Sequence, residues 1–284
     1  MRAPSRPPRV IMSANTETWL FLGATGRIGR MVLRHWSAVP PGARLVPQSR
    51  AAGEGLLQWD PLDPAVPVQA EVIFAFAGVT RSGEGARLNV DLGEAAVAMA
   101  RHCGVRRVLL ASSSAVYGPG AQMSEETPCK PVNDYGAAKL AMERAVAGAE
   151  VETCCLRIGN VAWADALLGR MGEGNAVTLD RFDDGEGPRR SYIGPRTLAD
   201  VLVALARHPD PLPPVLNVAL QRPVAMSGLL EAARQPWRWR PAPATAVQDV
   251  TLDCARLAAL VDLPEGAAEP AALIAEGEGL KEPA

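Results

Sequence analysis

The chain has 284 residues, of which 48% are hydrophobic and 21% charged, and its formal net charge at pH 7 is −2. This is the composition of a globular protein, and the length allows one domain or one and a half, so a disordered chain is excluded. The small net charge also excludes a bulk attraction to nucleic acid or acidic membranes, and we predict neither as a partner.

No apolar run approaches the roughly 20 residues that a membrane-spanning helix needs. The five cysteines form no C-x-x-C pair, which predicts thiols in a reducing compartment, no metal site and a cytoplasmic protein. Residues 1–16 carry arginines among prolines, and their short apolar stretch cannot form a signal-peptide core. They predict a disordered leader, or an upstream start with Met12 as the initiator.

The apolar residues 18–22 run directly into three glycines spaced three apart, and helical spacing resumes at Arg30. This pattern is typical of the strand, tight turn and helix that open a dinucleotide-binding unit. Glycine suits the turn because it allows unusual backbone angles and close approach to a pyrophosphate. Such turns also occur without a nucleotide, but the flanking strand and amphipathic helix favour binding. The turn residues predicted to contact a cofactor are Gly23, Thr25, Gly26, Arg27, Ile28 and Gly29.

Residues 43–47 predict a second strand, which leads to Gln48, Ser49 and Arg50. The residue that ends this strand faces the adenosine ribose in units of this type. An acidic residue there would repel a 2′-phosphate, whereas Gln48 or Ser49 tolerates one and Arg50 could attract it. NADP is therefore mildly favoured over NAD, with Ser49 and Arg50 in contact; the alternative is that Arg50 is a solvated surface residue.

Strands and helices then alternate along the chain. Residues 56–59 predict a short strand ending at Asp60, near an adenine edge, and the apolar run 71–78 predicts a buried strand whose small Ala77 and Gly78 let a cofactor pass. Further elements are expected at 89–102 (helix), 105–111 (strand), 135–149 (helix) and 151–158 (strand). This alternation predicts an α/β fold, a doubly wound parallel sheet of the Rossmann type covered on both sides.

The regular alternation of strands and helices ends after residue 158, which indicates a small, partly interleaved C-terminal region that binds the substrate. Within it, residues 195–207 predict a helix and 215–218 a strand of the main body, and 223–270 predict short helices around Trp237 and Trp239. The domains expected are a leader (1–16), a dinucleotide-binding domain (17–162), a substrate-binding region (163–270, with 196–218 returning to the Rossmann body) and a loose tail (271–284).

Tyr135 and Lys139 are four residues apart and so share one face of the predicted helix. Serines 112–114 end a strand at the edge of the sheet where ligands of open α/β folds bind. A lysine charge and a positive nicotinamide should lower the pKa of Tyr135, which could then exchange a proton with a substrate hydroxyl. Each motif alone is common on surfaces; together, after a glycine-rich turn, they predict a hydride-transfer site.

On three motifs, residues 23–29, 112–118 and 135–139, the chain resembles an extended short-chain dehydrogenase/reductase of the NAD-dependent epimerase/dehydratase family, over about residues 17–262. The resemblance implies bound NAD(P) and an oxidoreductase or epimerase that acts on a carbinol or carbonyl of a small-molecule substrate, sugar-like or a nucleotide sugar. It also implies a possible homodimer. The alternatives are an NADPH-dependent reductase of a small non-sugar carbonyl and a catalytically silent NAD(P)-sensing protein.

The resemblance assigns roles by position. Ser113, Tyr135 and Lys139 match the catalytic hydroxyl, the acid/base and its supporting lysine, and Tyr135 and Lys139 also contact the cofactor, as Asn89 does. The residues implied to bind substrate are Ser114, Asn160, Arg189 and Arg190. The two arginines could hold a phosphate or carboxylate, or form a solvated basic loop.

Three departures from the family pattern bear on the substrate and the reaction. The carboxyl-terminal part is shorter than in many nucleotide-sugar enzymes, and residues 161–164 replace the common Val-Tyr-Gly-Pro. Ser114 and Ala115 stand where dehydratases of the family commonly have Asp-Glu, which disfavours dehydration.

Overall fold

The structure is a computed structural model that describes residues 16–79, 85–171 and 176–277. Residues 1–15 of the predicted leader and 278–284 of the predicted tail lie outside the described residues.

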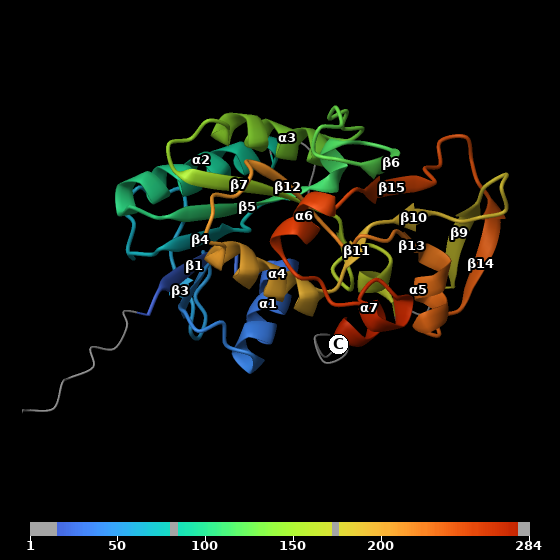
Figure 1. Cartoon of the computed structure of the whole chain (residues 1–284), viewed down its shortest axis with the longest axis horizontal. Coiled ribbons are helices and arrows are strands. Elements are labelled where there is room, and N and C mark those ends of the chain that lie inside the picture. The colour runs from blue at the N-terminus through green and yellow to red at the C-terminus, as the bar shows by residue number, and fades with distance from the viewer. Residues whose placement is uncertain (1–15, 80–84, 172–175, 278–284) are drawn as a thin grey trace, which may run out of the picture.

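A seven-stranded parallel sheet forms the centre of the described residues, with the strand order β12-β7-β5-β4-β1-β2-β3 (Figure 1). Strands buried on both faces need nearly continuous apolar runs, which is why Val72–Ala75 forms a fully buried β4. The chain order reverses between β1 and β4, so their carboxyl ends flank a crevice. The strands are β1 (Thr18–Leu22), β2 (Arg44–Ser49), β3 (Leu57–Gln58), β4 (Val72–Ala75), β5 (Arg107–Ser113), β7 (Glu152–Ile158) and β12 (Val215–Val218).

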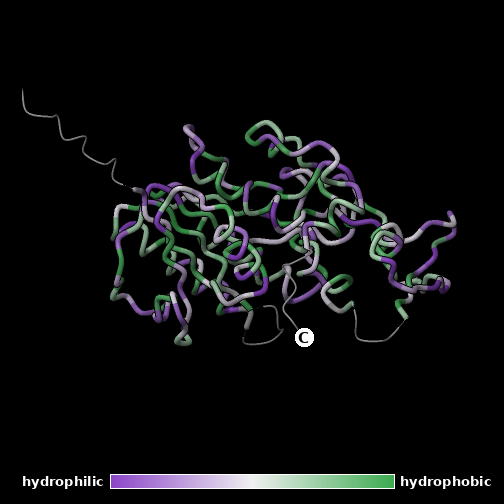
Figure 2. The backbone as a smooth tube through the Cα atoms, turned by 90° about the horizontal axis from the view of Figure 1, so that it is seen from below, coloured by the Kyte–Doolittle hydropathy of each residue, from purple (hydrophilic) through white to green (hydrophobic). Residues whose placement is uncertain are grey.

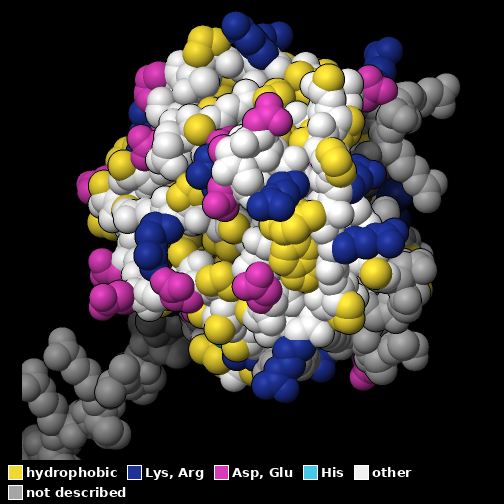
Figure 3. All heavy atoms as spheres, turned by 90° about the vertical axis from the view of Figure 1, so that its right-hand side faces the viewer, with side chains coloured by type: hydrophobic (Ala, Val, Ile, Leu, Met, Phe, Trp, Pro, Cys, Tyr) yellow, Lys and Arg dark blue, Asp and Glu magenta, His cyan; other side chains and the backbone are white. Residues whose placement is uncertain are grey.

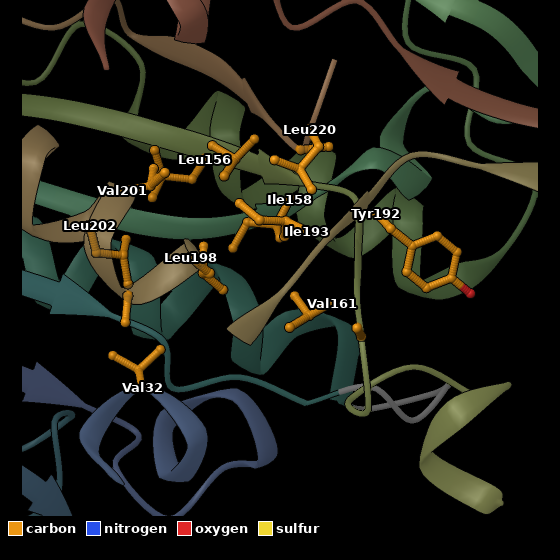
Figure 4. Packing of buried hydrophobic residues seen from close by; sticks show 14 of the residues in the cluster. Val32, Leu156, Ile158, Val161, Tyr192, Ile193, Leu198, Val201, Leu202 and Leu220 are labelled. Carbon is orange, nitrogen blue, oxygen red and sulfur yellow. The ribbon is translucent and has the colours of Figure 1, made fainter. Parts of the chain in front are cut away.

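Helices cover both faces of this sheet. In Figure 1, α2 (Gly85–Cys103) and α3 (Asp134–Val146) lie above it, and α1 (Arg27–Ala38) and α4 (Pro195–Arg207) lie below it. Figure 4 shows part of the lower layer, where Val32 of α1 points toward Leu198 and Leu202 of α4. The predicted fold class, a doubly wound α/β sheet, is therefore confirmed.

The remaining described elements form smaller sheets and short helices beyond the carboxyl ends of the main strands (Figure 1). The strand orders are β13-β10-β15-β6, β11-β8 and β14-β9. The elements are β6 (Gly120–Met123), β8 (Asn160–Val161), β9 (Val177–Arg181), β10 (Arg189–Arg190), β11 (Tyr192–Ile193), β13 (Val224–Ala225), β14 (Trp237–Pro241), β15 (Asp249–Leu252), α5 (Met226–Ala232), α6 (Ala255–Leu260), α7 (Pro270–Gly277), and the single turns η1 (Ser114–Val116) and η2 (Leu168–Arg170).

The helices predicted around Trp237 and Trp239 are wrong, because this segment is the strand β14, paired with β9. Trp and Arg alternate here, and a period of two places both indole rings on one face of a strand. The rings meet edge to face with centroids 4.6 Å apart, while Arg240 binds Asp180 across the pair.

The loose tail predicted from residue 271 is also corrected. Residues up to Gly277 belong to α7, whose Leu273 is fully buried. The Glu276 carboxylate accepts a hydrogen bond from the backbone N–H of Thr197 at 2.9 Å and another from its hydroxyl at 2.5 Å. Gly194, the N-cap of α4, has no side chain to satisfy the first N–H groups of that helix, so Glu276 of α7 supplies the cap.

Hydrophobic segments run through the interior of the main sheet, and many hydrophilic ones lie in the loops around it (Figure 2). The face in Figure 3, on the side of β9 and β14, mixes basic and acidic side chains and shows no continuous basic surface there. Within the described ranges, no helix has the length and apolar composition to cross a membrane. All five cysteines are free thiols, and no group of three or more potential metal-ligating side chains occurs among the described residues.

Candidate functional site

The glycine-rich turn closes tightly against β4. Gly23 has φ +84°, and a Cβ on it would lie 2.5 Å from the backbone N of Ala77. A Cβ on Gly29 would lie 2.5 Å from the Gly23 carbonyl oxygen. A side chain is therefore excluded at Gly23 and at Gly29, and Gly26 caps α1 without a side-chain hydrogen bond. A turn of this shape at a helix start leaves backbone N–H groups facing the crevice, as a diphosphate requires.

A cavity of about 220 Å³ lies beside this turn, at the end of β2. The predicted cofactor residues that line it are Gly23, Thr25, Gly26, Ser49, Arg50, Asp60, Ala77 and Gly78. Gln48 is buried, and its Oε1 accepts a hydrogen bond from the Gly23 N–H at 3.1 Å while its amide donates to the Trp59 carbonyl. Gln48 thus supports the turn, and Ser49 and Arg50, which follow it, line the cavity.

A second cavity, of about 840 Å³, begins at the same turn and ends at the predicted catalytic residues. Its volume is within the range of about 300–1,000 Å³ that small-molecule sites occupy. The structure therefore brings the turn and the catalytic motif together. The predicted residues on its wall are Gly26, Arg27, Ile28, Gly29, Gly78, Ser113, Tyr135, Lys139 and Asn160.

Tyr135 lies in the first turn of α3, which begins because the Asn133 side chain accepts a hydrogen bond from the Gly136 N–H at 2.8 Å. Burial raises the pKa of Tyr135, and a hydrogen bond with the Ser113 side chain opposes this increase. The expected lowering of this pKa by Lys139 is therefore corrected: desolvation outweighs it, and Lys139 is not among the groups that shift it. At neutral pH this phenol holds its proton and can donate it.

Lys139 is buried under the cavity, and its Nζ donates a hydrogen bond to the Ala111 carbonyl at 2.7 Å. Burial lowers its pKa to about 8, against an opposing effect of Cys155 and Glu143. A Cβ on Gly78 would lie 3.2 Å from this Nζ, so the lysine reaches the strand where a cofactor would pass.

Asn89 takes a supporting position. Its Oδ1 accepts a hydrogen bond from the Val79 N–H at 3.3 Å, and its amide donates to the Val79 carbonyl at 3.1 Å. It thereby fixes the segment after β4 that lines both cavities.

Three predicted substrate residues do not line the catalytic cavity. Ser114 is buried at the start of η1. Arg189 makes two hydrogen bonds of 2.8 Å with Asp249, and Arg190 donates to backbone carbonyl oxygens, including that of Gln248 at 2.7 Å. Both arginines lie in β10, inside a small sheet, where these contacts occupy their guanidinium groups.

Asp165, which lines the catalytic cavity, was not predicted from any sequence pattern. Burial raises its pKa. Its carboxylate accepts hydrogen bonds from the Tyr192 hydroxyl at 2.6 Å and the Leu168 N–H at 3.0 Å, and so shapes the loop above the cavity. Figure 4 shows the Tyr192 hydroxyl pointing away from the apolar cluster. The residues around Asp165 have no clear period, and its partner is 27 positions away.

Arg27 connects this loop to the glycine-rich turn. Its Nη1 donates a hydrogen bond to the Ala164 carbonyl at 2.7 Å. Trp163, beside it, has φ +68° and donates from its indole to the Ile274 carbonyl of α7 at 3.2 Å. Contacts from α1 and α7 thus hold the loop over the cavity from two sides.

The sequence model of the NAD dependent epimerase/dehydratase family matches residues 19–219. No curated protein sequence matches the chain. Among solved structures, the Bordetella bronchiseptica enzyme WbmG in complex with NAD has a TM-score of 0.75 at 17% identity, over 95% of this chain and 96% of that one. TunA, an NAD dependent NDP-hexosamine 5,6-dehydratase involved in tunicamycin biosynthesis, has a TM-score of 0.72 at 19% identity, over 94% and 99%.

A third similar structure is the UDP-N-acetylglucosamine 4-epimerase from Methanobrevibacter ruminantium M1, with a TM-score of 0.74 at 16% identity, over 94% of this chain and 100% of that one. At these identities the likeness concerns the fold.

Proposed function

Because the chain belongs to the NAD dependent epimerase/dehydratase family, we propose that it binds NAD(P) at the glycine-rich turn and transfers hydride to or from a carbinol or carbonyl carbon, with Tyr135 as the acid/base. The observation that carries the proposal is the continuous cavity from Gly26 to Tyr135 and Lys139. The substrate is sugar-like or a nucleotide sugar, in keeping with the similar folds of WbmG, TunA and the epimerase.

The residues present fit the cofactor, because Gly23 and Gly29 have no room for a Cβ and the turn ends at the start of α1, where the helix dipole favours a phosphate. A bound nicotinamide would supply or accept the hydride. Tyr135 would donate a proton to the substrate oxygen in reduction and remove it in oxidation. Ser113, hydrogen-bonded to Tyr135, would orient that oxygen, and Asn160 would contact the rest of the substrate.

The raised pKa of Tyr135 favours the proton-donating role near neutral pH, which supports reduction of a carbonyl. Phenolate is needed for the reverse step, and its fraction grows as pH rises toward the pKa. We therefore expect the oxidative rate to increase with pH over the range in which the reductive rate stays level or falls.

The direct test is the identity of the nucleotide that co-purifies with the protein, followed by turnover assays with sugar nucleotides and simple carbonyls. Tightly retained NAD would indicate an epimerase, and loosely bound NADPH a reductase. Failure to bind either cofactor in calorimetry would refute the proposal. A homodimer and a cytoplasmic location stay predictions.

We further propose that NADP is preferred, because β2 ends in Ser49 and Arg50 without a carboxylate. Arg50→Ala should weaken NADPH binding by about 10- to 100-fold, the effect of losing one or two charge-assisted hydrogen bonds, and leave NADH binding unchanged. Calorimetric dissociation constants for both cofactors measure this. Arg44→Ala, an exposed arginine at the other end of the same strand, is the control. Equal losses for NADH and NADPH would contradict the preference.

A further inference from the structure

Three ionisable residues stand one turn apart on the same face of α3, namely Tyr135, Lys139 and Glu143. Each contacts a different residue at the end of β5. The Tyr135 phenol hydrogen-bonds to the side chain of residue 113, Lys139 Nζ donates to the carbonyl of residue 111, and Glu143 Oε1 accepts from the hydroxyl of residue 112 at 2.5 Å. This face of α3 is thus bonded to three consecutive residues of β5, and Glu143 is the one of the three that does not line the catalytic cavity.

Glu143 is also fixed from the neighbouring strand. Its Oε2 accepts a hydrogen bond from Arg157 Nη2 at 2.7 Å, and the side chains of the pair are only 5% and 7% exposed. Ser112 and Arg157 are register partners across β5 and β7, so one carboxylate holds both strands. Arg157 continues to the Tyr117 hydroxyl at 2.8 Å, which donates to Asn217 of β12 at 2.7 Å.

We infer that Glu143 is a positioning residue, which keeps Lys139 charged and holds the Tyr135–Lys139 face of α3 in register with the end of β5. Its consequence for turnover rests on the proposed function, but its effect on Lys139 does not. The three similar contacts and the burial of the whole group carry this inference, because a buried ammonium next to the cavity needs a nearby anion.

The pKa shifts of the neighbouring groups are consistent with this role of Glu143. Burial lowers the Lys139 pKa to about 8, while Glu143 and Cys155 oppose this change. Burial raises the pKa of the Cys155 thiol to about 12, so near neutral pH this thiol is uncharged, and the ion pair in this group is that of Glu143 with Arg157. The charged or titratable groups that interact with Glu143 are Arg157, Lys139, Cys129 and Cys155.

The sequence makes a direct measurement practical, because its lysines are only Lys130, Lys139 and Lys281. In a Lys130→Arg, Lys281→Arg background, biosynthetic ¹³C-lysine labelling leaves Lys139 as the single labelled side chain, and its ¹³Cε shift reports its pKa without any turnover. Glu143→Gln should lower this pKa by about one to three pH units, the usual effect of removing a nearby opposite charge.

The matched control is Glu152→Gln, which removes the partner of Arg107, 2.6 Å away, at the other end of β7. This variant should lose stability and leave the Lys139 pKa unchanged. Where Glu143→Gln fails to fold, the double variant Glu143→Leu, Arg157→Leu replaces the ion pair by apolar side chains. Its Lys139 pKa should also be lowered, but by less, because a positive charge is removed together with the negative one. An unchanged Lys139 pKa in either folded variant overturns the inference.

Turnover is a separate readout. Charged Lys139 is lost as pH rises through its pKa, so the alkaline fall in kcat of Glu143→Gln should begin about one to three pH units lower than in the unmodified chain. A lowered pKa with no turnover in the unmodified chain would support the role of Glu143 and refute the proposed function instead.

Discussion

Tyr135→Phe is expected to reduce kcat by about 10²- to 10⁴-fold, the contribution typical of a positioned general acid or base. The phenol lies on the wall of the cavity that begins at the glycine-rich turn, so its loss removes the proton donor without changing the turn. Cofactor affinity should therefore stay the same. Steady-state kinetics together with calorimetric cofactor binding would measure both quantities.

The matched control for this variant is Tyr192→Phe. Tyr192 also loses a hydroxyl hydrogen bond in this variant, that to Asp165 at 2.6 Å, but it does not line the catalytic cavity. We expect lower stability and a much smaller loss of kcat. Equal kcat values for Tyr135→Phe and the unmodified chain would rule out Tyr135 as the acid/base, whereas an unaltered physiological output of the variant would favour a cofactor-sensing protein.

The glycine-rich turn and the Tyr135–Lys139 pair were predictable because both depend on local chemistry. Gly23 must have positive φ and no Cβ, and only glycine meets both conditions, so its requirement is visible in the sequence. The i, i+4 spacing of Tyr135 and Lys139 fixes their shared face before any tertiary contact forms. The buried runs of β1 and β4 likewise determine a parallel sheet.

The substrate side was less predictable, because its contacts join residues far apart in sequence. From the sequence, Arg189 and Arg190 are candidate ligands for an anion. In the structure their guanidinium groups donate to Asp249 and to the carbonyl of Gln248, each about sixty positions away. The pKa of Tyr135 depends on how deeply the closed fold buries it, which no motif encodes. In both cases the three-dimensional surroundings determine the chemistry.

Arg107→Leu should cost about 3–5 kcal/mol in the free energy of unfolding, the usual result of removing one partner from a buried charged group. Arg107 is 1% exposed at the start of β5. Its guanidinium donates to Glu152 at 2.6 Å, to the Leu205 carbonyl of α4 at 2.5 Å and to the Asp210 carbonyl at 3.0 Å. It thus satisfies carbonyl groups at the buried end of α4 and beyond it.

Denaturant unfolding would measure this loss, with Arg106→Leu as the neighbouring control. Arg106 bonds to the Ala206 carbonyl and pairs with Glu17 at 3.3 Å, but its side chain is 41% exposed, so water can replace these contacts at a cost of about 1 kcal/mol or less. Similar losses for the two variants would show that burial does not decide the value of the contact. Two adjacent arginines thus look alike in the sequence, and only the packing of α4 over β5 makes one of them essential to the fold.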